Sequence, residues 1–138
     1  MKLAYIAGKY RGKTEDEIYE HIYLARKQAK ILLKMGYAYI CPHMNTAFMG
    51  GCTAHNDDDV FLKIDMEILS RCDCIVMLPN WRESAGARQE LNFAMARGMM
   101  VFFAGMDDEE METFAQSAGG GVNYAVYGTA GRDDDSLN

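Results

Sequence analysis

A strand that leads directly into a helix, within residues 73–98, constrains the fold more than any other part of the sequence. The run from Cys74 to Leu78 is short and entirely apolar, which is typical of a strand buried on both faces. Pro79 ends this run, and apolar residues then recur with helical spacing as far as Gly98, a favoured helix stop. Buried strands that alternate with helices are typical of α/β proteins, so we expect the same unit elsewhere in the chain.

The alternation extends over most of the 138 residues. We expect strands at 2–7, 37–41, 74–78 and 99–104, and helices that begin near Thr14, Asp57 and Ser84. This pattern predicts a single three-layer, Rossmann-like (flavodoxin-like) α/β domain with four to five mostly parallel strands and helices on both faces. Residues 1–105 would form its main part. Residues 106–138 would be a C-terminal extension with a short acidic helix (107–116), an edge strand (122–127) and a frayed tail.

Composition narrows the classes of function. The net charge of -6 argues against a general nucleic-acid binder, whose binding surface is basic. No apolar run reaches the length of a membrane span, and the N-terminus becomes charged too early for a secretion signal, so we expect a cytoplasmic protein. The four cysteines are then expected as reduced thiols.

Candidate functional residues follow three of the expected strands. These segments are Gly8 to Gly12, His43 to Asn56, and Asn80 to Glu90. Ligands of parallel sheets bind where the carboxyl ends of strands meet, so the three segments are expected to converge at one edge. Ser84 is placed as a helix N-cap, and we expect Glu90 in or near the first turn, where the helix dipole favours an ionised carboxylate.

Each candidate also has a structural interpretation. Tyr5 within a strand is more often a packing residue, and Arg11 is either a solvated cation or a ligand for phosphate or carboxylate. Asp65 lies at the margin of an apolar helix face, either bonded to a loop or held next to Glu90. Trp81 either stacks on a base or covers the sheet edge. Zinc is not expected, because the Cys and His spacing between 41 and 55 fits no standard site.

Several motifs, in this order, resemble the nucleoside 2-deoxyribosyltransferase superfamily, which includes the deoxyribonucleoside 5'-monophosphate N-glycosidases. They are Tyr5-Ile-Ala-Gly with Tyr10-Arg-Gly, Asp65 leading into Ile68-Leu69-Ser-Arg-Cys-Asp73, and Ser84-Ala-Gly86 followed by Glu90-Leu. The segments Cys-Pro-His-Met-Asn-Thr-Ala-Phe and Leu-Pro-Asn-Trp-Arg-Glu-Ser look still more like a branch found in bacteria and phages. The resemblance covers about residues 1–105.

The resemblance implies roles for these residues. Glu90 matches the nucleophile that attacks the anomeric carbon, Asp65 the aspartate that assists the departing base, and Tyr5 a tyrosine that positions the nucleophile. Ser84 and Arg11 match residues that hold the 5' end of the nucleotide. The full set of candidate substrate-binding residues is Gly8, Arg11, His43, Asn45, Trp81, Ser84 and Gly86.

The expected function is therefore cleavage or transfer of the N-glycosidic bond of 2'-deoxyribonucleosides or their 5'-monophosphates. No cofactor or metal is expected. The partner would be a small molecule rather than a nucleic-acid polymer or a membrane, and the protein would be a homodimer or higher homo-oligomer. An inactive nucleotide-binding or sensing module of the same fold is one alternative, because fold does not fix function. A zinc-stabilised interaction domain built on the Cys and His residues between 41 and 55 is the other.

Overall fold

The computed structural model describes residues 1–45, 49, 51, 57–125 and 127. Its sheet has four strands in the order β2-β1-β3-β4, and all neighbouring pairs are parallel. The strands are β1 (Leu3–Ala7), β2 (Ala38–Ile40), β3 (Cys74–Met77) and β4 (Met100–Phe103). The helices are α1 (Glu15–Lys34), α2 (Pro42–Asn45), α3 (Asp57–Leu69), α4 (Ala85–Ala96) and α5 (Asp108–Ser117), with a short 3-10 turn, η1 (Trp81–Glu83).

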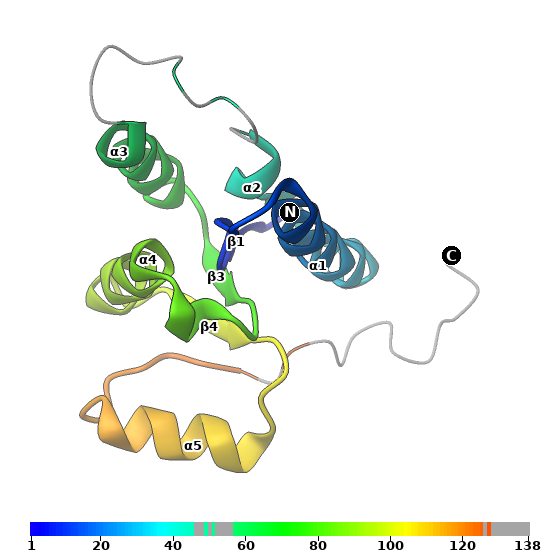
Figure 1. Cartoon of the computed structure of the whole chain (residues 1–138). Coiled ribbons are helices and arrows are strands. Elements are labelled where there is room, and N and C mark those ends of the chain that lie inside the picture. Colours follow the sequence, from blue (N-terminus) through cyan, green and yellow to red (C-terminus); the bar gives the residue numbers. More distant parts are fainter. Residues whose placement is uncertain (46–48, 50, 52–56, 126, 128–138) are drawn as a thin grey trace.

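The sheet lies between two helical layers, which confirms the α/β fold predicted from the alternation (Figure 1). Helix α1 covers one face, where Ala25, Ala29 and Leu32 pack against alternate side chains of the strands. Helices α3 and α4 lie on the other face, and α5 adds Met111 to the same core cluster. β3 is buried at every residue, as its unbroken apolar run predicted.

Local signals in the sequence account for the helix boundaries. Thr14 caps α1 by accepting a hydrogen bond from the backbone N–H of Glu17, at 3.2 Å. Ser84 caps α4 in the same way, accepting from the N–H of Ala87 at 3.1 Å. Gly36 follows α1 with a positive φ of 83°, a conformation that glycine adopts without steric cost.

The C-terminal part differs from the sequence expectation. Instead of an edge strand over 122–127, the described residues there form one isolated parallel bridge, between Val101 and Tyr124. The expected tail at 128–138 lies outside the described residues, as does most of the expected loop from 43 to 57. The beginning of that loop is helical in the structure, as α2. None of the helices described is long and apolar enough to cross a membrane.

Candidate active site

A cavity of about 840 Å³ opens at the carboxyl ends of β1 and β3. One wall is the loop after β1, from Gly8 to Gly12, and another is the entrance of α4, from Glu83 to Ala87. Helix α3 closes a third side with Phe61, Leu62 and Asp65. The carboxyl edge of a parallel sheet is the usual ligand site of this architecture, so the cavity lies where the topology predicts it.

Glu90 is the central polar group of the cavity. Its side chain is 7 % exposed, and among the described residues it is the charged group most completely enclosed by the core. The Tyr5 hydroxyl, which projects from β1 toward the α3 and α4 face, donates a hydrogen bond to Glu90 Oε2. A buried carboxylate needs such a donor, because desolvation otherwise disfavours its charge. The pair therefore holds the carboxyl group in one orientation at the wall of the cavity.

The position of Glu90 corrects the expectation that the helix dipole keeps it ionised. Helix α4 begins at Ala85, which places Glu90 in the second turn, and the first turn holds no acidic residue. The pKa of Glu90 is raised to about 8, mainly because the group is buried; the Tyr5 hydrogen bond lowers it and the charge of Asp65 raises it by smaller amounts. Desolvation thus outweighs the dipole, whose influence falls off beyond the first turn.

Asp65 supplies a second carboxyl group to the same cavity. Burial raises the pKa of Asp65 to about 6, and its Oδ1 atom is enclosed without a hydrogen-bond partner. The Asp65 charge also contributes to the raised pKa values of Tyr5 and Glu90, which places the three groups close together. Of the two interpretations of Asp65, the structure supports the one that holds it beside Glu90. With one proton between them, such a pair can provide both a base and an acid.

The structure brings most of the candidate residues together at this cavity. Gly8, Arg11, Ser84, Gly86, Asp65 and Glu90 all line it, and Tyr5 contacts it through Glu90. The side chain of His43 lies outside the described residues. Asn45 is exposed on α2 and is absent from the cavity wall.

Trp81 adopts the second of its two interpretations. Its ring is 8 % exposed and packs against Phe103 and Phe114, with ring centroids 6.2 and 5.8 Å away. It covers the end of the sheet beneath α5 and does not line the cavity. The prediction that Trp81 stacks on a base is therefore wrong for this structure, because the aromatic side chains of α5 and β4 enclose the ring.

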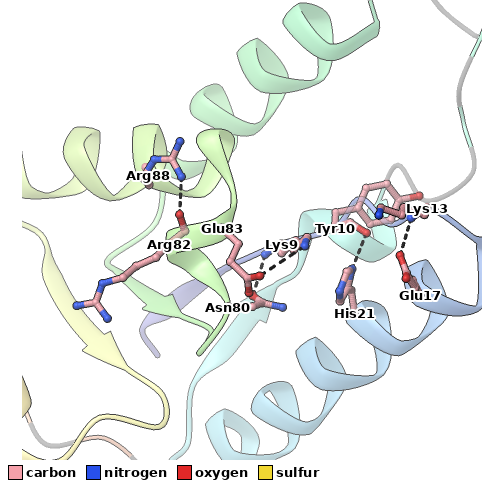
Figure 2. A network of polar contacts seen from close by, with 9 residues as sticks. All are labelled: Lys9, Tyr10, Lys13, Glu17, His21, Asn80, Arg82, Glu83 and Arg88. Carbon is pink, nitrogen blue, oxygen red and sulfur yellow. Dashed lines mark hydrogen bonds and ion pairs between the residues drawn. The ribbon is translucent and has the colours of Figure 1, made fainter.

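Sequence reasoning did not single out Phe61, Leu62 or Gln89, which line the cavity. Phe61 and Leu62 of α3 line it, and neither is among the candidate residues. Gln89 lines it beside Glu90. Asn80, which follows β3, contacts the loop after β1 and is not part of the wall (Figure 2). Asn80 belongs to the candidate segment that follows β3, because it lies at the carboxyl end of a buried strand.

The space around Gly8 differs from the space around Gly86. A Cβ at Gly8 would lie 2.6 Å from Leu78 Cδ1 and 2.8 Å from Asn80 Oδ1, so the close packing of two loops requires glycine there. A Cβ at Gly86 would meet nothing nearer than Ser84 Oγ at 3.9 Å and Leu62 Cδ1 at 4.0 Å. The protein itself therefore leaves room for a side chain at Gly86, and that room belongs to the cavity wall.

The same α/β fold occurs in solved structures that are 15–18% identical to this chain. The 2-deoxyribosyltransferase from Bacillus psychrosaccharolyticus superimposes with a TM-score of 0.59 at 17% identity, covering 98% of this chain and 95% of that one. The CMP N-glycosidase BcmB from Clostridium botulinum gives 0.54 at 15% identity, covering 99% and 95%. A conserved protein from Enterococcus faecalis V583 gives 0.56 at 18% identity, covering 91% and 81%.

The chain belongs to the family described as Domain of unknown function (DUF4406), whose match spans residues 1–103. This match covers the whole sheet and the helices α1 to α4, and it therefore includes Tyr5, Asp65 and Glu90. Among curated proteins, no relative matches the chain significantly.

Proposed function

We propose that this protein cleaves or transfers the N-glycosidic bond of 2'-deoxyribonucleosides or their 5'-monophosphates, with Glu90 as the nucleophile. The observation that carries the proposal is the buried Glu90 carboxyl group, oriented by the Tyr5 hydroxyl and placed with Asp65 at the wall of a cavity. Cleavage of this bond develops positive charge on the sugar, and an enclosed carboxylate stabilises such charge strongly. The names of two proteins that share the fold, a 2-deoxyribosyltransferase and a CMP N-glycosidase, agree with this chemistry.

The reaction would proceed in two displacements. In the first, a Glu90 oxygen forms an ester bond with the anomeric carbon while the bond to the base nitrogen breaks. The electron pair of that bond leaves with the base, which takes a proton from Asp65. In the second, water or another base attacks the anomeric carbon, gives up a proton to Asp65 and releases Glu90. Water as the acceptor gives hydrolysis, and a base gives transfer.

The raised pKa values suit this scheme. The nucleophile must be ionised and the acid protonated, so the reactive form carries a single proton on the pair. Positive charge that develops on the sugar lies against Glu90 and favours its ionised form. The proton then resides on Asp65, where the departing base can take it.

The proposal is tested by incubation with a panel of deoxynucleosides and their 5'-monophosphates, with the released bases separated by chromatography. Replacement of Glu90 by Gln keeps the size of the side chain and removes the nucleophilic charge. We expect base release to fall by roughly a thousandfold or more, while nucleotide binding measured by calorimetry persists, because the lost interaction is made mainly in the transition state.

The matched control is Glu67→Gln, which removes an exposed carboxylate on α3 that pairs with Arg71 at 2.7 Å and does not line this cavity. This variant should retain full activity. Base release that is unchanged in Glu90→Gln would contradict the mechanism. Binding of a nucleotide without base release by the unmutated protein would favour the inactive binding module instead.

A further inference from the structure

The loop after β1, residues 8–13, carries part of the cavity wall and is attached to the rest of the molecule on two sides. On one side it contacts α1, where the N–H of Lys13 donates to Glu17 Oε2 at 2.5 Å and His21 Nδ1 lies 3.0 Å from the Tyr10 carbonyl oxygen. On the other side it meets the segment that joins β3 to α4. Figure 2 shows both sets of contacts in one view.

Asn80 makes the second attachment. Its Oδ1 atom accepts a hydrogen bond from the backbone N–H of Lys9 at 2.9 Å, and the same oxygen lies close to the position that a Cβ at Gly8 would occupy. An ion pair between Lys9 Nζ and Glu83 Oε1, at 3.7 Å, spans the same junction. This pair is partly exposed and contributes little by itself, so the hydrogen bond to the backbone is the specific contact.

The junction joins two segments with different functions in the proposed reaction. The loop after β1 presents Tyr10 and Arg11 to the cavity, and the segment after β3 leads into Ser84 and the helix that carries Glu90. A displacement of one segment relative to the other would change the distance between the groups that bind the substrate and the group that attacks it. Small displacements of this kind have large effects on binding and rate.

We propose that Asn80 is a positioning residue for the substrate: through the N–H of Lys9 it fixes the 8–13 loop against the entrance of α4, so that the loop side of the cavity is already formed before substrate binds. This inference rests on the proposed function. Asn80 does not line the cavity, and it acts through the loop rather than on the reacting atoms. Its loss should therefore weaken substrate binding more than it slows the chemical step.

The test compares Asn80→Ala, which removes the acceptor, with Asn80→Asp, which keeps an oxygen acceptor of the same size. We expect Asn80→Ala to raise KM about tenfold while kcat changes less than about threefold, and Asn80→Asp to restore KM to near the unmutated value. The matched control is Asn123→Ala. It removes a side-chain hydrogen bond to the Gly98 carbonyl oxygen (3.4 Å) before β4, at the opposite edge of the sheet, and should change neither constant.

Amide hydrogen exchange provides a readout that does not depend on catalysis. The N–H of Lys9 should exchange faster in Asn80→Ala than in the unmutated protein and should regain its protection in Asn80→Asp. If the unmutated protein proves inactive, the proposed function fails, whereas the exchange rates still decide whether Asn80 fixes the loop. If Asn80→Ala does not fold, Asn80→Ser replaces it.

Two results would overturn the inference. One is a hydrogen-exchange rate of the Lys9 amide that is the same in Asn80→Ala as in the unmutated protein. The other is a rise in KM as large in Asn80→Asp as in Asn80→Ala, because rescue by the conservative variant separates the hydrogen bond from the shape of the side chain.

Discussion

At the scale of single residues, the protons of Glu90 and Asp65 determine the pH at which the site can react. Burial raises the pKa values of both groups, to about 8 and about 6. Below the lower value both carboxyl groups are protonated and no nucleophile exists. Above the higher value both are ionised and no acid remains. Since the reactive form holds one proton, we expect kcat/KM to follow a bell-shaped curve with a maximum between about pH 6 and pH 8.

The profile of kcat/KM for base release between pH 4 and pH 10 checks this expectation, with Glu67→Gln as the control for an exposed carboxylate. The acidic limb reports the loss of the charged nucleophile and the basic limb the loss of the acid. Replacing Asp65 by Asn should abolish the basic limb and lower the plateau. A rate that rises continuously with pH would exclude Asp65 as the acid.

Arg11 provides a second test at this scale. It is an exposed cation in the cavity wall, and a guanidinium group binds phosphate oxygens through paired, charge-assisted hydrogen bonds. We expect Arg11→Ala to raise KM for a deoxynucleoside 5'-monophosphate at least tenfold more than KM for the corresponding deoxynucleoside. KM values of both substrates, measured for the unmutated protein and for Arg11→Ala, test this prediction. Arg97→Ala, directly after the end of α4 and outside this cavity wall, is the control. An equal rise in KM for the two substrates would mean that Arg11 does not bind the 5'-phosphate.

At the scale of elements, a substitution at the entrance of α4 can distinguish the stability of the fold from the binding of substrate in the cavity. Gly86 lies in the first turn of α4, without a positive φ, and has room for a Cβ. Gly86→Ala should therefore leave the free energy of unfolding unchanged or raise it by up to about 1 kcal/mol, because alanine is the better helix former. The added methyl group reduces the cavity, so KM should rise.

Urea denaturation and steady-state kinetics on the same preparations measure the two effects. Gly8→Ala is the contrasting variant, because its Cβ would clash with Leu78 at 2.6 Å and the protein should lose stability. A Gly86→Ala protein with unchanged KM would mean that substrate does not approach this turn.

At the scale of the whole molecule, the sequence predicted the layers better than the site. Alternating apolar runs, caps such as Thr14 and Ser84, and helix-ending glycines predicted the order of β1, α1, β3 and α4, because these signals are local. The burial of Trp81 depends on α5, and the depth of Glu90 depends on how α4 packs on the sheet. Such tertiary contacts join distant segments, and no local pattern encodes them. Homo-oligomerisation stays a prediction.

The depth of Glu90 has a consequence for the stability of the entire domain. Its pKa in the folded protein is about 8, against 4.5 for an unburied group. A raised pKa stabilises the folded state fully below the unfolded value, and this contribution is lost as the pH rises through the folded value. Between pH 5 and pH 9 the folded protein must either keep a proton that the unfolded chain releases or bury a charge.

Glu90→Gln removes this ionisation altogether. The variant should therefore gain stability relative to the unmutated protein as the pH rises, by roughly 2–4 kcal/mol more at pH 9 than at pH 5. Urea denaturation at the two pH values measures the difference. Glu67→Gln, which changes a carboxylate in solvent, should alter the free energy of unfolding by the same small amount at both pH values. A difference between Glu90→Gln and the unmutated protein that does not change with pH would mean that Glu90 is already ionised at pH 5. The Tyr5 hydrogen bond would then outweigh the desolvation of the carboxylate.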